Sequence, residues 1–165
     1  FSAYATGLHV HINKNCMPAE NWIKIVNFFS NNSDFIFLIS RRTRWDFEEW
    51  TNINSMERIF DVGYVNERRF VALNLQNKHT AEFRIFAGTL SPVDFFASLE
   101  FCDSLVRFVQ GQSFNNMFHN IDSLKRFIGY VIENRMKYPS LWLTLVNDGF
   151  VVNLSGEYEY NTNRG

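Results

Sequence analysis

Two histidines and a glutamate–arginine pair are the residues of this sequence whose types and spacing best suit a binding or catalytic site. His9 and His11 alternate with the apolar residues of Gly7–Asn13. Glu82 and Arg84 alternate in the same way with the apolar residues of a later stretch. A period of two is typical of half-buried β-strands, so each pair should lie on one face of its strand. Imidazole and carboxylate bind divalent metal ions and guanidinium binds phosphate, so together they are the parts of a nucleotide-dependent phosphoryl-transfer site.

A β-hairpin over residues 68–86 is predicted to position the glutamate and the arginine. Both of its arms alternate between apolar and polar residues, and the polar break Gln76–Lys78 is short enough for a hairpin loop. We expect the strand Gly7–Asn13 to join the hairpin in one antiparallel sheet, with all the apolar faces on a common core. The opposite face then carries a cluster of polar side chains: His9, His11, Arg68, Asn74, Glu82 and Arg84.

The order of these motifs resembles the C-terminal half of the amidoligase family. This family belongs with glutamine synthetase and glutamate–cysteine ligase among the carboxylate–amine ligases. The motifs that carry the resemblance are Gly7-Leu8-His9-Val10-His11 and Thr80-Ala81-Glu82-Phe83-Arg84-Ile85-Phe86. The intervening stretch Phe70–Leu75 also fits, as does Gly88-Thr89-Leu90 before a predicted helix rich in Phe, Leu and Glu. The resemblance extends from about Thr6 to Val109.

The resemblance implies a fold, a reaction and residue roles. The implied fold is α+β, an antiparallel sheet with helices packed on one face, as half of a glutamine synthetase-like catalytic domain. The implied reaction depends on ATP and Mg2+: a small-molecule or peptide carboxylate becomes an acyl phosphate, and an amine displaces the phosphate. His9 and Glu82 are the implied metal ligands. Arg84 is the implied catalytic residue and phosphate contact, and His11 is the implied nucleotide contact.

Further arginines receive roles from the same resemblance. An upstream catalytic arginine is implied at Arg68, with Arg69 as the alternative. Nucleotide-binding arginines are implied at Arg41 and Arg42, which open a basic cluster over residues 41–45. The residues alone leave a solvated loop equally open for this cluster, because runs of charge usually lie on wet surfaces.

One feature departs from the family pattern. Enzymes of this group take further metal-binding carboxylates from strands before the histidine pair, typically a Glu-x-Glu motif, and this sequence shows no such strand before Gly7. We therefore expect the remaining ligands to come from an N-terminal half of a longer polypeptide or from a partner chain. The alternative is a non-catalytic structural or interaction module that retains the fold.

The composition bounds the class of protein. With 165 residues, 46% hydrophobic residues and 18 Phe, the chain should form one globular domain, which we place at residues 1–150, followed by a polar tail at 151–165. The net charge of −1 does not favour nucleic-acid binding, and no apolar run approaches the roughly 20 residues of a membrane span. Cys16 and Cys102 are isolated and are expected to be inert thiols. A cytoplasmic enzyme of bacterial or phage origin fits the resemblance, with association with a virion as the alternative.

Apolar residues at helical spacing predict the elements that cover the sheet. Ser91, Pro92 and Asp94 form a strong helix start, and the helix should bury a stripe at Phe95, Phe96, Leu99, Cys102, Val106 and Val109. A helix capped by Asp34 is favoured over a buried strand for the segment that ends at Ser40. The other expected elements are helices over Pro18–Ser30, after Asp122 and over Ser140–Val146, and an irregular loop over Asp46–Asn66 with room for one helical turn.

Overall fold

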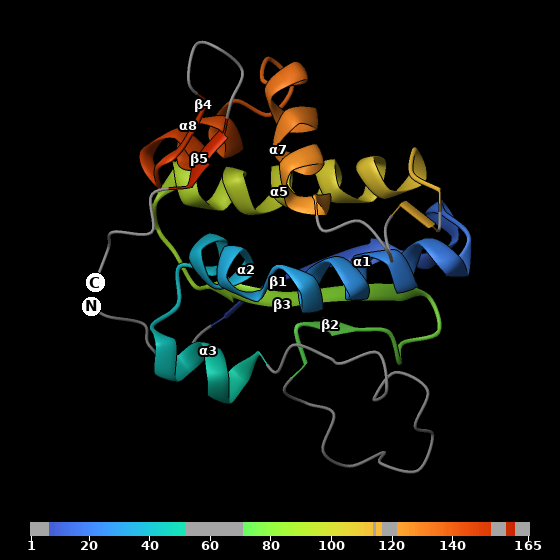
Figure 1. Cartoon of the computed structure of the whole chain (residues 1–165). Coiled ribbons are helices and arrows are strands. Elements are labelled where there is room, and N and C mark those ends of the chain that lie inside the picture. Colours follow the sequence, from blue (N-terminus) through green and yellow to red (C-terminus); the bar gives the residue numbers. More distant parts are fainter. Residues whose placement is uncertain (1–6, 52–70, 114, 117–121, 153–157, 161–165) are drawn as a thin grey trace.

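A three-stranded antiparallel sheet with helices packed against it forms the described part of the chain, which is therefore α+β (Figure 1). The computed structural model describes residues 7–51, 71–113, 115–116, 122–152 and 158–160. Helices α5, α7 and α8 lie above the pair α1 and α2 in Figure 1, and strand β2 lies below that pair. The elements are β1 (Gly7–Asn13), α1 (Ala19–Asn31), α2 (Ser33–Ser40), α3 (Arg44–Trp50), β2 (Leu73–Asn74), β3 (Thr80–Ala87), α5 (Pro92–Gln110), α7 (Ser123–Glu133), α8 (Pro139–Asn147), β4 (Phe150–Val152) and β5 (Tyr158–Tyr160).

Strand β3 is the central strand, and the order across the sheet is β1-β3-β2. The strand pairing places Glu82 of β3 opposite His11 of β1 on one side and opposite Asn74 of β2 on the other. The apolar face of β3 is closed to solvent, since Ala81, Phe83 and Ile85 are all fully buried. The predicted alternation and the antiparallel pairing are confirmed, although β2 is a short strand and residues 68–70 of the predicted first arm lie outside the described residues.

Aromatic rings join the sheet to the helical layers. Phe101 of α5 has no exposed surface and contacts the ring of Phe86 on β3 with centroids 6.0 Å apart. Its ring also lies 6.4 Å from Phe29 of α1, 6.2 Å from Phe35 of α2 and 5.7 Å from Phe127 of α7. Phe101 therefore sits where α5 meets four other elements, in a core that consists largely of apolar side chains.

Helix α5 begins as the sequence predicts. The hydroxyl of Ser91 accepts a hydrogen bond from the backbone N–H of Asp94 at 3.3 Å, and Pro92 occupies the first helical turn. This bond satisfies one of the N–H groups that the first turn leaves without an intrahelical partner.

Replacing Ser91 by Ala should lower the free energy of unfolding by about 0.5–2 kcal/mol, because the cap of α5 is lost. Chemical denaturation followed by circular dichroism would measure this change. Ser33→Ala, which alters an exposed serine in the first turn of α2, is the matched control. Equal stabilities of the Ser91 variant and the wild type would show that the cap contributes nothing.

The predicted buried stripe of α5 is partly wrong. Phe95 and Phe96 remain 39% and 52% exposed, and Leu99 is only partly buried. The prediction counted apolar residues without knowing which side of α5 its neighbours cover. Helix α8 packs against α5, and Ala97 and Ser98 lie with Leu141 and Thr144 around one small pocket. The face that the fold buries carries Ala97, Phe101, Cys102, Leu105, Val106, Phe108 and Val109.

Three further expectations differ from the structure. Helix α3 covers Arg44–Trp50, where a loop with at most one helical turn was expected. The hydroxyl of Thr43 caps this helix by accepting from the N–H of Asp46 at 3.2 Å. Helix α2 is a helix as favoured, but it begins after Asn32 and Asp34 lies within its first turn. Strands β4 and β5 pair where a polar tail was expected. None of the helices in the described part of the chain has the length and apolar character of a membrane span.

Candidate functional site

The polar face of the sheet gathers five of the side chains that the sequence placed there. We call them the polar cluster: His9, His11, Asn74, Glu82 and Arg84. Strand β1 supplies the imidazoles, β2 the amide and β3 the carboxylate and guanidinium. The alternation of apolar and polar residues is what directs all of them to the same face, because the apolar neighbours on each strand are drawn into the core.

Glu82 is the centre of the polar cluster. Its Oε1 atom lies 2.8 Å from Nδ1 of His9, 3.8 Å from Nε2 of His11 and 3.3 Å from Nε of Arg84. Its Oε2 atom accepts a hydrogen bond from the amide of Asn74 at 3.0 Å. The carboxylate is only 13% exposed, so these contacts replace most of its hydration.

Two side chains are held in orientation by local hydrogen bonds. The amide oxygen of Asn74 accepts from the N–H of Gln76 at 3.0 Å, which leaves the amide nitrogen directed at Glu82. Nδ1 of His11 lies 3.4 Å from the hydroxyl of Thr80, its near neighbour across the sheet. The cluster is therefore built from short, locally fixed contacts on strands, which position side chains more accurately than loops do.

His9 is the imidazole closest to Glu82. Partial burial, followed by the positive charge of Arg84, lowers the pKa of His9 below its ordinary value, although Glu82 opposes the shift. A carboxylate only accepts hydrogen bonds, so a neutral His9 donates its Nδ1 proton to Glu82 and carries the lone pair on Nε2. His9 thus holds the neutral form that a metal ligand requires.

A metal ion at the contact between His9 and Glu82 requires the other neutral tautomer, in which the proton of His9 lies on Nε2. The lone pair of Nδ1 and the Oε1 atom of Glu82 then fit one edge of a metal coordination sphere. Two ligand atoms about 2.1 Å from one ion and at right angles to each other are roughly 3 Å apart, and these two atoms are 2.8 Å apart. Among the residues that the structure describes, no group of three or more His, Cys, Asp and Glu side chains is arranged to hold a metal ion. An ion bound at this edge would therefore need further ligands from beyond the described residues.

Arg42 lies beside the polar cluster, but its described contacts are with backbone atoms. Its Nε donates to the carbonyl of Ile85 at 3.0 Å and its Nη2 to the carbonyl of Phe86 at 2.9 Å. Burial lowers the pKa of the guanidinium, Asp46 opposes this shift, and the charge of Arg84 adds to it. The structure thus brings Arg42 to the edge of the cluster with these donors directed at the sheet.

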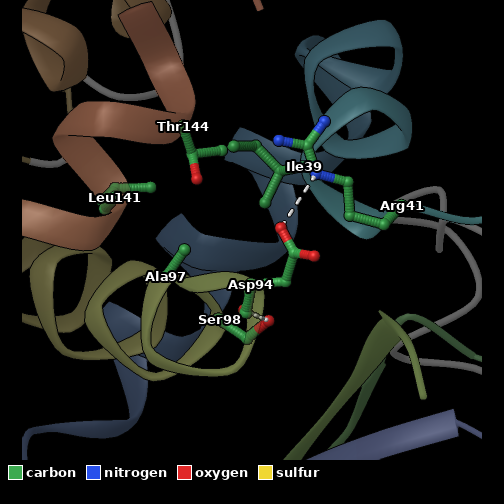
Figure 2. A pocket seen from close by; sticks show the side chains of 7 residues that line it. All are labelled: Ile39, Arg41, Asp94, Ala97, Ser98, Leu141 and Thr144. Atoms are coloured by element: carbon green, nitrogen blue, oxygen red, sulfur yellow. Dashed lines mark hydrogen bonds and ion pairs between the residues drawn. The ribbon is translucent and has the colours of Figure 1, made fainter. Parts of the chain in front are cut away.

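Arg41 points away from the polar cluster, toward the helices. It has a left-handed backbone conformation with φ of 59° at the end of α2, so its side chain and that of Arg42 diverge. Its Nη1 donates to Asp148 at 2.9 Å, and its Nε lies 3.8 Å from a carboxylate oxygen of Asp94 (Figure 2). Figure 2 shows it at the rim of a small pocket whose other lining residues are Ile39, Asp94, Ala97, Ser98, Leu141 and Thr144. The structure therefore does not join Arg41 to the predicted nucleotide site.

The remaining arginine predictions, Arg68 and its alternative Arg69, lie outside the described residues. The feature that sequence reasoning missed is a β-bulge in β3, described below, together with the role of Gly7 beside it. One sequence signal could have revealed the bulge. Ile85 and Phe86 are adjacent apolar residues in an otherwise alternating strand, and both are buried.

Comparison of the chain with protein-family models, with curated proteins and with solved structures gave no match. Functional inference for this chain therefore rests on the geometry of the polar cluster and on the resemblance of its two motifs.

Proposed function

We propose that this chain belongs to an ATP- and Mg2+-dependent carboxylate–amine ligase and forms half of a glutamine synthetase-like catalytic domain. The observation that carries the proposal is the convergence of His9, His11 and Arg84 on Glu82 over one face of an antiparallel sheet. The four residues come from the two motifs that resemble the amidoligase family. A sheet of this kind offers a rigid platform for positioning, which supplies most of the catalysis in phosphoryl transfer.

Each side chain of the polar cluster has a role in this proposal. Arg84 contacts a phosphate of ATP and the phosphate that is transferred to the carboxylate substrate, through charge-assisted hydrogen bonds. His11, whose side chain is 52% exposed, is accessible for contact with the nucleotide. Glu82 and His9 hold a metal ion at their shared edge, and such an ion would neutralise phosphate charge when bound. An imidazole ligand suits Mn2+ at this position at least as well as Mg2+.

The charge of the polar cluster requires further carboxylates. Glu82 already faces Arg84 at 3.3 Å, so the one carboxylate of the cluster is electrostatically offset before any cation binds. A divalent ion would also be repelled by Arg42, whose charge acts on His9. We therefore place the remaining metal-binding carboxylates on an N-terminal half or on a partner chain that covers the polar face.

A non-catalytic module that retains the fold is the second candidate. The observation that favours it is that the two carboxylate oxygens of Glu82 already contact four side chains of the cluster. Such a network can stabilise the pairing of three strands without binding anything. Nucleotide binding separates the two candidates, because only the ligase needs it.

The test is a calorimetric titration with a non-hydrolysable ATP analogue in the presence of Mg2+ or Mn2+. It should be run on this chain and on the complete natural polypeptide that contains it, followed by a ligation assay over a panel of carboxylates and amines. We expect metal-dependent binding that Arg84→Ala weakens and that Arg135→Ala, an exposed arginine at the end of α7, leaves unchanged. Absence of nucleotide binding in both forms would overturn the ligase proposal and would favour the non-catalytic module instead.

A further inference from the structure

A β-bulge interrupts the pairing of β1 with β3 at the polar cluster. Leu8 pairs with Phe86 and Val10 pairs with Phe83, so one residue of β1 lies opposite two residues of β3. The single residue is His9, and the two residues opposite it are Arg84 and Ile85. A bulge of this kind turns the side chains around it and loosens the local ladder of hydrogen bonds.

The guanidinium of Arg42 binds the bulged strand from outside the sheet. It donates to the successive carbonyls of Ile85 at 3.0 Å and Phe86 at 2.9 Å. A planar guanidinium can bridge two acceptors with a fixed spacing, whereas the single ammonium group of lysine cannot reproduce this geometry. Arg42 thus fixes the backbone immediately after Arg84, on the strand that also carries Glu82.

Gly7 provides the space that this guanidinium occupies. A Cβ atom at Gly7 would lie 2.6 Å from Nη2 of Arg42, 3.3 Å from Nε2 of His9 and 3.4 Å from the carbonyl of Phe86. The first of these separations is shorter than real Cβ contacts allow, so a side chain at this position would displace the guanidinium. The glycine that begins the histidine strand is therefore explained by the close approach of Arg42.

The segment that carries Arg42 is itself fixed. The N–H of Arg42 donates to the hydroxyl of Ser40 at 3.1 Å, just after the left-handed residue Arg41 ends α2. Asp46, which is 7% exposed, supports the guanidinium charge from the first turn of α3. Residue 42 is thus anchored through its backbone N–H, and the negative charge of Asp46 favours the charged guanidinium.

We propose that Arg42 is a positioning residue, which clamps the β-bulge so that Glu82 and Arg84 face His9, and that Gly7 is required to admit it. The resemblance implies that Arg42 contacts the nucleotide directly. Because its guanidinium donates to the carbonyls of Ile85 and Phe86, we assign it the indirect role of holding the strand that carries Glu82 and Arg84. The proposal concerns the geometry of the polar cluster, and its effect on ligand binding rests on the proposed function.

The test compares Arg42→Lys, Arg42→Gln and Gly7→Ala with the wild type, and uses Arg135→Lys as the matched surface control. Nuclear magnetic resonance at fixed pH and without ligand would follow the Nδ1 proton of His9, which reports its hydrogen bond to Glu82. Binding of inorganic phosphate and of the Mg2+ complex of the ATP analogue would be measured on the same samples. Thermal denaturation would be recorded for each variant.

We expect all three variants to lose the NMR signal of the His9 Nδ1 proton that is hydrogen-bonded to Glu82, which we call the His9–Glu82 signature. We also expect them to bind phosphate about tenfold more weakly, as is typical when a residue that supports a binding site from its second layer is replaced. Gly7→Ala keeps the arginine and displaces only the end of its flexible side chain, so it decides the matter if the Arg42 variants fail to fold. Retention of the signature in Gly7→Ala and in Arg42→Lys would overturn the proposal. Weaker binding with an intact signature would show that Arg42 contacts the ligand directly, and would overturn it too.

The same experiment separates this inference from the proposed function. If the wild type binds neither phosphate nor nucleotide, the ligase proposal fails, while the His9–Glu82 signature still decides whether Arg42 positions the cluster.

Discussion

Under the proposed ligase function, replacing Glu82 by Gln is expected to reduce ATP-dependent ligation by at least about a hundredfold. The amide has nearly the same shape as the carboxylate, so the change removes charge and leaves packing intact. It weakens the charge-assisted contact with Arg84 at 3.3 Å, and it leaves one acceptor oxygen where the carboxylate offers two, to His9 at 2.8 Å and to Asn74 at 3.0 Å. It also removes the only carboxylate of the polar cluster, and with it the anionic ligand of the proposed metal edge.

The measurement is the initial rate of ligation at saturating ATP, together with calorimetric binding of the nucleotide. Glu133→Gln is the matched control, because Glu133 is an exposed residue at the end of α7. Chemical denaturation of both variants shows whether the fold is kept. A Glu82→Gln enzyme with nearly wild-type activity would remove Glu82 from the site and would leave the polar cluster as a structural network.

Replacing Phe101 by Ala should cost about 3–5 kcal/mol of unfolding free energy, a large part of the stability of a domain of this size. Its ring is fully buried and contacts rings from α1, α2, α7 and β3. Four separate elements would have to move to fill the space, so the cavity would largely remain. The edge-to-face contacts with Phe86 and Phe127 would be lost as well.

Phe96→Ala in the same helix is the matched control, because that ring is 52% exposed. It should change the free energy of unfolding by less than about 0.5 kcal/mol, as surface substitutions usually do. Guanidinium denaturation followed by circular dichroism would give both values. Similar costs for the two substitutions would mean that α5 presents a different face to the core than the structure shows.

The sequence by itself was sufficient to predict which residues share a face. The period of two in Gly7–Asn13 and in Thr80–Ala87 placed His9, His11, Glu82 and Arg84 on the polar side, because each strand has to bury its apolar side chains. The start of α5 was predictable for an equally local reason. A capping serine satisfies one free N–H group of the first helical turn, and a proline after it has no N–H to satisfy, whatever the rest of the chain does.

Other features depend on contacts between residues far apart in the chain, and only the tertiary structure decides them. The register that places Glu82 between His11 and Asn74 is set by strand pairing over a long separation, which no local pattern encodes. The exposure of Phe95 and Phe96 depends on which face of α5 the neighbouring elements cover. The diverging directions of Arg41 and Arg42 depend on one left-handed residue at the end of α2. The β-bulge opposite His9 has a local cause and a long-range cause. The adjacent apolar residues Ile85 and Phe86 allow the bulge locally. The hydrogen bonds of Arg42 to their carbonyls, from 43 and 44 residues away, hold it in place.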